Sequence, residues 1–226
     1  MAVTNKDLLS FFSAAKQKTY SAGETVLFGE NPSGVMCIQQ GVIKVYSISD
    51  EGDQYIHVLY KTGEIFPLIW AIKDVKRRVF YEATTQSKVA EVSKEEFLKF
   101  IKKDTDVLYD VLSQLAEQFQ VFAERLDNLL YKSAHEKVVY RLMFLASRFG
   151  VREGNKIVIE APLTHELISE TINLARETVS REIEKLEKNK LIARQSGLIV
   201  IIDINKLTKE FSEPISLDLW GLNSKY

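Results

Sequence analysis

The sequence predicts an α+β protein, with a β-rich first part, a long helix in the middle and a last part that mixes helices with short strands. Three observations support this prediction. Short stretches of β-branched and aromatic residues alternate with turn residues from residue 19 to residue 92. Leucine and phenylalanine then recur at alternating steps of four and three residues over 108–129. After residue 133, new amphipathic helical patterns are followed by two apolar strands joined by a tight turn.

Length and composition limit the classes of protein that fit. A chain of 226 residues that is 46% hydrophobic can bury the core of one large domain or of two small ones. Its 30 Lys and Arg residues against 31 Asp and Glu residues give a formal net charge of -1. This balance argues against a generally basic nucleic-acid-binding protein, so any nucleic-acid site must be a local patch.

Cys37 is the single cysteine of the chain. One cysteine excludes a disulfide framework, a cysteine-rich zinc site and an iron–sulfur cluster held by four thiolates of one chain. Residues 1–13 lack the apolar core of a signal peptide, and the longest apolar run elsewhere, 198–202, is far too short to span a membrane. We therefore expect a cytoplasmic protein with no membrane partner.

The spacing of the strands in the β-rich part predicts a barrel or a sandwich. Gly, Asn and Pro residues between the strands allow the chain to reverse. Residues 50–53 have the composition of a hairpin tip. The predicted strands are 24–28, 35–39, 42–48, 55–60, 79–84 and 89–92.

A helical part begins at Ser93, which is suited to cap a helix because Glu96 follows three residues later. The longest helix carries an apolar stripe at heptad spacing, named the seam. The seam consists of Leu108, Leu112, Leu115, Phe119, Phe122, Leu126 and Leu129. Such a stripe usually packs on its own domain, but Val107, Val111 and Val121 are apolar too, which indicates two buried faces. We predict that one face packs on the barrel and that the seam pairs with a second copy of the chain.

The last part has the element order of a winged helix-turn-helix. The seam breaks around 131–134, and Val138, Leu142 and Leu145 begin a new amphipathic helix that ends near 149–150. The elements predicted after it are a strand at 156–159, helices at 164–172 and 175–188, and a hairpin of strands 191–194 and 198–203. The three predicted regions are 1–103, 104–132 and 133–226.

The second helix of this motif presents residues that are suited to reading DNA bases. Asn173 lies where the chain reverses before this helix, and Asn tolerates the left-handed conformation that such turns often need. Val179, Ile183 and Leu186 form the inward face of the helix. Arg can donate two hydrogen bonds to guanine, and Glu can accept one from cytosine. The alternative is a solvated face with internal salt bridges, and the charges alone leave both open. The outward residues of the first turns are Arg176, Glu177, Ser180 and Arg181.

Two segments carry a resemblance to a known family. Residues 176–181, Arg-Glu-Thr-Val-Ser-Arg, and residues 186–192, Leu-Glu-Lys-Asn-Lys-Leu-Ile, resemble the recognition helix and the start of the wing in the Crp/Fnr family of transcription regulators. The resemblance extends over nearly the whole chain. It implies an N-terminal cyclic-nucleotide-binding-type β-roll (a jelly roll), a long dimerisation helix and a C-terminal winged helix-turn-helix. The glycines that mark the β-roll are Gly23, Gly34, Gly41, Gly52 and Gly63.

By this resemblance the protein is a homodimeric regulator that binds a pseudo-palindromic site in double-stranded DNA, contacts RNA polymerase and is not an enzyme. Arg176, Glu177 and Arg181 would read a half-site of the TGTGA type. Ser180, which the Fnr branch shares, would widen or shift the preference. The family's phosphate-contact positions hold Thr164, His165, Ala175 and Thr178, of which Ala175 lacks the usual hydroxyl and His165 replaces an Arg.

The sensor pocket implied by the resemblance departs from that of the cyclic-AMP-binding members. Pro67-Leu68 replaces the Gly-Glu pair that holds the ribose, and Leu68 cannot accept a ribose hydrogen bond. Arg77-Arg78 keeps the charge of the Arg-Ser pair but not its hydroxyl, and Phe122-Ala123 replaces the Thr-Ser that contacts adenine. These departures argue against cyclic AMP as the effector. The candidate pocket residues are Leu68, Trp70, Arg77, Arg78, Phe122 and Ala123.

Several alternatives for the sensor stay open. The apolar and basic pocket residues would suit a small apolar anion, or they fill the pocket and the regulator works without a ligand. A haem-based gas sensor would need an axial ligand from His57 or Cys37. His135 and His165 lie in the helical part, and each is best explained as a structural residue.

Two other classes of function are disfavoured. A metal-dependent β-barrel enzyme would need a cluster of histidines and carboxylates, but His57 is the one histidine of the barrel, so we expect no metal site. A ligand-binding protein that has lost DNA binding would not need the intact set of Arg176, Glu177 and Arg181. The extension at 207–226 carries the apolar residues Phe211, Leu217, Leu219 and Trp220, which would pack on the winged domain or on the partner subunit.

Overall fold

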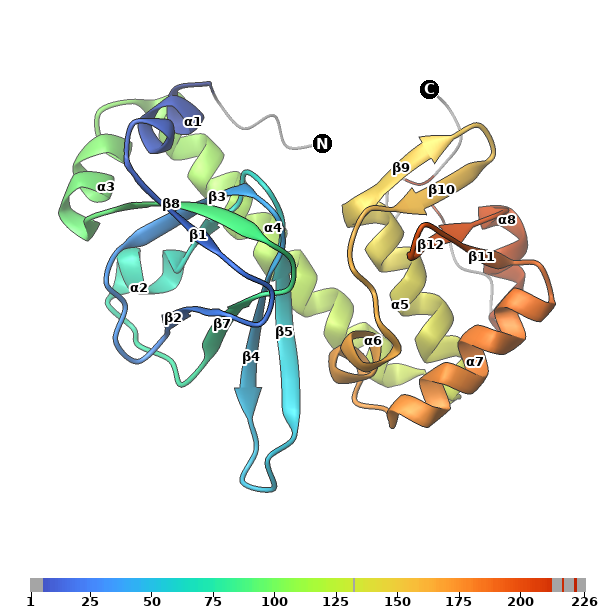
Figure 1. Ribbon diagram of the computed structural model, residues 1–226. Helices are drawn as coiled ribbons and strands as arrows, with labels where there is room; N and C mark the ends of the chain where they lie inside the picture. Colours follow the sequence, from blue (N-terminus) through green and yellow to red (C-terminus); the bar gives the residue numbers. More distant parts are fainter. Residues whose placement is uncertain (1–5, 132, 213–216, 218–221, 223–226) are drawn as a thin grey trace. The chain divides into compact units, whose positions relative to one another are not determined.

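The computed structural model describes residues 6–131, 133–212, 217 and 222 (Figure 1). The chain divides into two compact units, residues 1–122 and 123–226. The boundary falls within the helix α4 (Thr105–Leu130), so this helix contributes to both units. The finer division into 1–103, 104–132 and 133–226 stays a prediction. Both units mix helices and strands, which confirms the α+β class.

The first unit contains two antiparallel sheets of four strands, as the predicted barrel or sandwich requires. Their strand orders are β1-β8-β3-β6 and β2-β7-β4-β5. The strands are β1 (Lys16–Tyr20), β2 (Thr25–Phe28), β3 (Val35–Gln40), β4 (Ile43–Ile48), β5 (Gln54–Tyr60), β6 (Ile65–Phe66), β7 (Phe80–Ala83) and β8 (Ser87–Val92). β1 is not among the predicted strands, because this edge strand is exposed at four of its five residues and shows no apolar alternation.

The hairpin of β4 and β5 confirms the turn predicted at 50–53 (Figure 1). The N–H of Ser49 donates to the carbonyl of Asp53 at 2.9 Å, and the N–H of Gly52 donates to the carbonyl of Ser49 at 3.0 Å. Gly52 has a φ of 93°, a region that glycine occupies without the clash of a Cβ atom.

Helices α1 (Lys6–Ser13), α3 (Lys94–Ile101) and the start of α4 share one hydrophobic core with β3 and β8. Phe12, Phe97 and Cys37 are among its buried side chains. α3 begins as predicted, because the Ser93 hydroxyl accepts from the N–H of Glu96 at 3.2 Å and the Glu96 carboxylate accepts from the N–H of Ser93 at 3.0 Å. This reciprocal cap satisfies two backbone donors of the first turn.

The buried face of α4 contains two glutamines that sequence analysis did not single out. Oε1 of Gln114 accepts from the N–H of Ile65 at 2.9 Å, and its Nε2 donates to the carbonyl of Gly63 at 3.2 Å. Nε2 of Gln118 donates to the carbonyl of Ile65 at 3.4 Å. Both glutamines are buried. They bond to the backbone of the short strand β6 and of the turn before it, so they attach the helix to the sheet.

The opposite face of α4 is apolar and exposed. Phe119 is 74% exposed and Leu126 is 65% exposed, whereas Val107 and Val111 on the buried face are 0% exposed. Leu115 and Phe122 are half-buried. The helix therefore has the two apolar faces that the sequence predicts. The exposed members of the seam are Leu108, Leu112, Phe119, Leu126 and Leu129.

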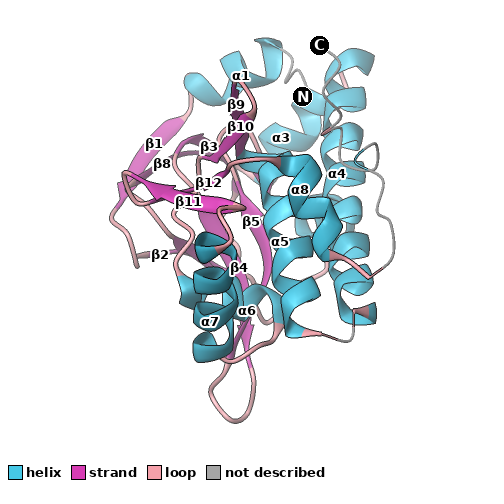
Figure 2. Ribbon diagram, turned by 90° about the vertical axis from the view of Figure 1, so that its right-hand side faces the viewer, coloured by secondary structure: helices cyan, strands magenta, loops and turns pink. Residues whose placement is uncertain are grey.

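The second unit has the predicted order of helix, strand, helix, turn, helix and hairpin (Figure 2). Its sheet has the strand order β11-β12-β10-β9. The sequence analysis did not predict β9. This strand lies at the edge of the sheet and three of its four residues are exposed, so it shows no apolar pattern. The elements are α5 (Ala134–Phe149), β9 (Gly150–Glu153), β10 (Lys156–Ile159), α6 (His165–Ile172), α7 (Arg176–Lys188), β11 (Ile192–Gln195), β12 (Leu198–Ile201), α8 (Ile204–Leu207) and η1 (Thr208–Glu210).

The described part of the extension at 207–226 packs within the second unit. Phe211 is buried, and its ring lies 5.4 Å from the ring of Tyr131 and 6.5 Å from that of Tyr140. Leu222 is also buried, and Arg152 donates to its carbonyl. Of the other apolar residues of the extension, Leu219 and Trp220 lie outside the described residues. None of the described helices combines the length and the apolar character needed to cross a membrane.

Candidate nucleic-acid interface

The turn between α6 and α7 has the conformation that the sequence predicts. Thr164 caps α6, since its hydroxyl oxygen accepts from the N–H of Leu167 at 3.0 Å. Asn173 ends α6 in the left-handed conformation with φ 55° and ψ 49°. Arg125 donates to the side-chain oxygen of Asn173 at 3.3 Å. A cap, a left-handed residue and a side-chain contact therefore set the angle at which α7 leaves the turn.

α7 has one buried face and one exposed face, as predicted. Val179, Ile183 and Leu186 are at most 1% exposed. Of the four predicted base-reading residues, Arg176, Glu177 and Arg181 are exposed and Ser180 is partly buried. All four lie in the first two turns of the helix, on the half that begins at its N-terminus. The structure thus brings them together on one helix.

Two of these side chains have partners on α7 itself. Nε of Arg181 donates to the carbonyl of Glu177 at 3.4 Å, and its terminal nitrogen donates to the hydroxyl of Thr178 at 3.2 Å. The Ser180 hydroxyl donates to Oε1 of Glu184 at 3.1 Å. Arg181 therefore lies back along its own helix and must extend to reach a base.

The four predicted phosphate-contact residues lie at the N-termini of the two helices. Thr164 caps α6 and Ala175 occupies the cap position of α7, where it offers no side-chain acceptor. His165 begins α6, and its Nδ1 lies 3.1 Å from the Ser180 hydroxyl oxygen. Burial lowers the pKa of His165, and Arg194 lowers it further. Helix N-termini attract phosphate groups through their free N–H groups and positive dipole ends.

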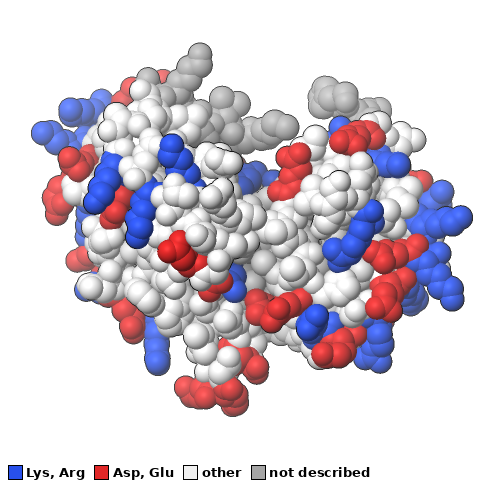
Figure 3. Space-filling model, in the orientation of Figure 1, with Lys and Arg blue, Asp and Glu red and all other residues white. Residues whose placement is uncertain are grey.

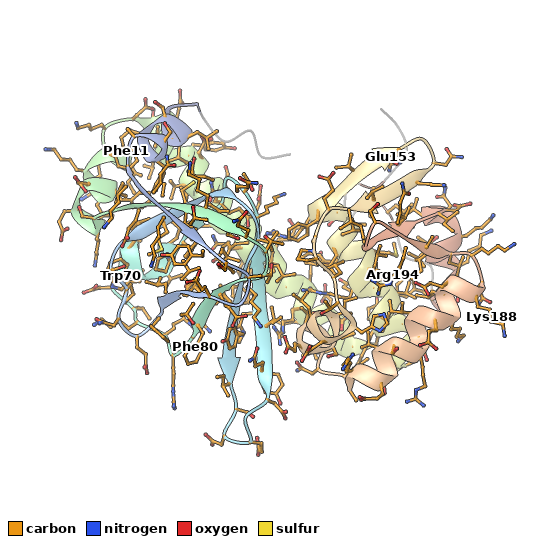
Figure 4. All side chains as sticks on the ribbon, viewed as in Figure 1. Phe11, Trp70, Phe80, Glu153, Lys188 and Arg194 are labelled. Atoms are coloured by element: carbon orange, nitrogen blue, oxygen red, sulfur yellow. The ribbon has the colours of Figure 1, made fainter. Side chains whose placement is uncertain are left out.

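Charges of both signs cover this region. Between residues 174 and 194 the chain has six basic and four acidic residues. Figure 3 shows blue and red side chains interspersed over the face of the second unit that is in view. Arg194 on β11 pairs with Glu187 on α7 at 3.5 Å, and Lys188 lies at the far end of α7 (Figure 4). The local excess of positive charge is small, which predicts modest and salt-sensitive affinity for phosphates.

His135, which sequence analysis explained as a structural residue, contacts α7 and one other element. Nδ1 of His135 on α5 lies 2.7 Å from Glu182 on α7, and Nε2 lies 2.8 Å from Glu210 on η1. Next to it, Glu136 accepts hydrogen bonds from the hydroxyl and the N–H of Ser212. Sequence spacing gave no signal for these contacts, because the partners lie 47 to 76 residues away.

The first unit contains a cavity next to α2 (Leu68–Lys73). Four of the six predicted pocket residues line it, namely Leu68, Trp70, Arg77 and Phe122, whereas Arg78 does not, and Ala123 belongs to the second unit. The free space is about 40 Å³, room for roughly three water molecules. His57 and Tyr81 line it as well, two strand residues that the pocket prediction lacked. Burial raises the pKa of Tyr81 to about 12, so its hydroxyl stays neutral.

Neither candidate haem ligand stands out as a metal ligand. Cys37 is buried in the core shared with α1 and α3, and burial raises the pKa of its thiol to about 12. A thiol binds metal as the thiolate, which this environment disfavours. Nε2 of His57 lies 3.0 Å from the hydroxyl of Ser47. Among the described residues no group of three or more His, Cys, Asp and Glu side chains could hold a metal ion.

Two family models match the two units. The model of the Crp-like helix-turn-helix domain matches residues 136–210, and that of the cyclic nucleotide-binding domain matches residues 17–104. The matched ranges contain α7 with its predicted base-reading residues and both sheets of the first unit. Together they span most of the chain.

Similar proteins extend the likeness over nearly the full length. The cAMP-activated global transcriptional regulator CRP of Salmonella typhimurium is 26% identical over 203 residues, which cover 88% of this chain and 95% of that protein. The global nitrogen regulator of Synechococcus elongatus is 23% identical over 196 residues, covering 85% and 88%. Among solved structures, FixK2 from Bradyrhizobium japonicum aligns with a TM-score of 0.75 at 19% identity, covering 89% of this chain and all of that chain. A CRP/FNR-family transcriptional regulator from Thermus thermophilus aligns with a TM-score of 0.67 at 20% identity, covering 86% and 97%.

Proposed function

This chain belongs to the Crp/Fnr family of DNA-binding transcription regulators, and we propose that it binds a pseudo-palindromic operator as a homodimer. The observation that carries the proposal is the division of α7 into a buried face and an exposed reading half. Arg176, Glu177 and Arg181 are exposed at the end of the helix that enters the major groove in helix-turn-helix proteins.

The seam supports the dimer. A stripe of exposed leucines and a phenylalanine at heptad spacing is costly in water, and a second copy of the same helix would cover it. A two-fold axis along the seam would present two reading helices to successive major grooves, about 34 Å apart. The DNA site would then be a pseudo-palindrome with one half-site for each chain.

Each reading residue has a base partner that its chemistry favours. The guanidinium groups of Arg176 and Arg181 can each donate two hydrogen bonds to O6 and N7 of guanine, and Glu177 can accept from N4 of cytosine. Thr164, His165, Ala175 and Thr178 lie where phosphates would approach the two helix N-termini. The predicted roles of these eight residues, Ser180 included, are part of the proposal.

The test is a selection of binding sites from random duplexes, followed by affinity measurements on the selected site. Arg181→Ala should weaken specific binding by about 1–3 kcal/mol and relax the preference at one base pair per half-site. Lys188→Ala, on the exposed far end of the same helix, is the matched control and should leave the preference unchanged. An equal loss on every sequence for the Arg181 variant would assign it to phosphate contact instead.

The cavity of the first unit supports a regulator that does not respond to cyclic AMP. Leu68 and Phe122 line it, and its free space is about 40 Å³, room for roughly three water molecules. We propose that these side chains fill the pocket, with a small apolar anion next to Arg77 as the alternative. Calorimetric titration with cyclic AMP and with benzoate separates the two: the filled pocket predicts no binding of either, and stoichiometric binding of cyclic AMP would contradict both.

The remaining parts of the proposal follow from DNA binding. The chain would act in the cytoplasm, where the chromosome of a bacterium lies, and its role is regulatory rather than enzymatic. RNA polymerase is the expected partner at a promoter. Transcription in vitro from a promoter that carries the selected site, with and without the protein, tests this partner directly.

A further inference from the structure

The hydroxyl group of Ser180 is held between two side chains on the reading side of α7. Its oxygen lies 3.1 Å from Nδ1 of His165 and 3.1 Å from Oε1 of Glu184. Serine has one hydroxyl proton, and a carboxylate can only accept. The Ser180 proton therefore goes to Glu184. His165 must in turn donate its Nδ1 proton to the Ser180 oxygen, because that oxygen has no second proton to give.

The surroundings of His165 agree with this assignment. Burial lowers its pKa, Arg194 and Arg176 lower it further, and Glu187 and Glu184 oppose them. A neutral imidazole has one N–H, and the contact with Ser180 assigns it to Nδ1. Nε2 is then an acceptor, and this atom is buried with no hydrogen-bond partner among the described residues. The neutral ring therefore donates its one N–H to the Ser180 oxygen.

We propose that His165 and Glu184 fix Ser180 as a hydrogen-bond acceptor in DNA recognition, an inference that rests on the proposed function. The Ser180 oxygen has two lone pairs, one of which takes the His165 N–H, so one remains for DNA. In the major groove adenine N6 and cytosine N4 are donors, whereas guanine O6 and thymine O4 are acceptors. Ser180 therefore selects adenine or cytosine at the base that it faces. A serine without these two partners could accept from adenine or cytosine and donate to guanine or thymine, so it would not distinguish the four bases.

Duplexes that differ at each position of the selected half-site measure this selection. At one position the wild-type dimer should prefer adenine and cytosine over guanine and thymine by about fivefold, the effect of one net hydrogen bond. Ser180→Ala should abolish the preference at that position alone. Glu184→Ala should also abolish the preference at that position, because the freed Ser180 hydroxyl can then donate to guanine or thymine.

Two further variants separate the hydrogen bond from charge and from phosphate contact. Glu184→Gln removes the same charge as Glu184→Ala but keeps an acceptor oxygen, so it should retain the preference. His165→Ala should weaken the preference at the same position, beyond any uniform loss from its proposed phosphate contact, and a loss that is equal on all duplexes would overturn its role here. Circular dichroism and thermal unfolding check that each variant folds as the wild type does.

The outcomes distinguish this inference from the proposed function. Absence of any sequence-specific binding by the wild type overturns both. Specific binding in which Ser180→Ala changes no base preference, or in which Glu184→Ala and Glu184→Gln behave alike, leaves the proposed function standing and overturns the inference.

Discussion

Nδ1 of His135 lies 2.7 Å from Oε2 of Glu182, which joins the first turn of α5 to the middle of α7. The other ring nitrogen lies 2.8 Å from Oε2 of Glu210 on η1. Because carboxylates only accept, a ring nitrogen of His135 that carries a proton can donate to the carboxylate next to it. One side chain therefore joins three elements of the second unit, one of which is the reading helix.

Replacing this histidine should weaken the second unit. His135→Ala leaves the carboxylates of Glu182 and Glu210 without their shared donor, at sites where the side chains are only partly exposed. We expect the free energy of unfolding to fall by roughly 1.5–3 kcal/mol, the range for hydrogen bonds to charged groups. Urea unfolding followed by circular dichroism measures the change.

Two further variants make this measurement specific. His135→Gln keeps one donor and should lose less stability than His135→Ala. Lys185→Ala removes a side chain that lies 3.9 Å from the same Glu182 but is mostly exposed, so its effect should be small. Equal unfolding midpoints for the wild type and His135→Ala would show that the contact contributes nothing.

The hydrogen bonds between Glu136 and Ser212, which hold the extension on α5, should weaken in acid. Hydrogen bonds from Ser212, and then from Ser133, lower the pKa of its carboxyl to about 2 from an ordinary value of 4.5. A lowered pKa stabilises the fold above the ordinary value, and this stabilisation is lost as the pH falls from 4.5 toward 2. The stability difference between the wild type and Glu136→Gln should therefore shrink between neutral pH and pH 3. A difference that is the same at both pH values contradicts this assignment.

Replacing Gln114 should lower the free energy of unfolding of the first unit. Gln114→Leu keeps the bulk of the side chain but leaves the N–H of Ile65 and the carbonyl of Gly63 without these partners. A buried polar group that loses its partner costs about 1–3 kcal/mol, so we expect a loss in that range or above it. Gln120→Leu, at an exposed position of the same helix, is the control. Thermal and urea unfolding should separate the two variants clearly.

The seam predicts the oligomeric state. Phe119→Glu places a charge in the middle of the exposed apolar stripe, where a second copy would bury it, so the variant should be monomeric at concentrations at which the wild type is dimeric. Gln120→Glu adds the same charge to the neighbouring exposed position and serves as the control. Sedimentation velocity measures both. A wild type that sediments as a monomer at all concentrations would remove the basis of the dimer.

Local sequence signals predicted much of the fold. The cap at Ser93, the turn at 50–53 and the left-handed Asn173 each depend on a few adjacent residues, and the structure confirms all three. The two faces of α4 and of α7 follow from helical spacing in the same way. Edge strands β1 and β9 were beyond this reasoning, because their exposed residues show no periodic apolar pattern.

Long-range polar contacts account for most of the rest. Gln114 and His135 act through partners 47 or more residues away, and no spacing rule links them. The contact of His165 with Ser180 spans only 15 residues, but it crosses the turn between α6 and α7, so helical spacing does not predict it either. The family pattern predicted four of the residues that line the cavity. It did not predict the strand residues His57 and Tyr81. The strand register decides which face of a sheet these side chains lie on, and the register is set by long-range pairing.

Two copies of this chain are proposed to read two half-sites of one DNA site, and the stoichiometry and the half-site spacing of the complex test this proposal. Sedimentation of the wild type with a duplex that carries the selected site should give two chains per duplex. Moving the half-sites apart by about half a helical turn, roughly 5 base pairs, should abolish the complex, because both reading helices then no longer face the major groove together. One chain per duplex, or an affinity that does not depend on the spacing, would contradict dimeric binding to paired half-sites.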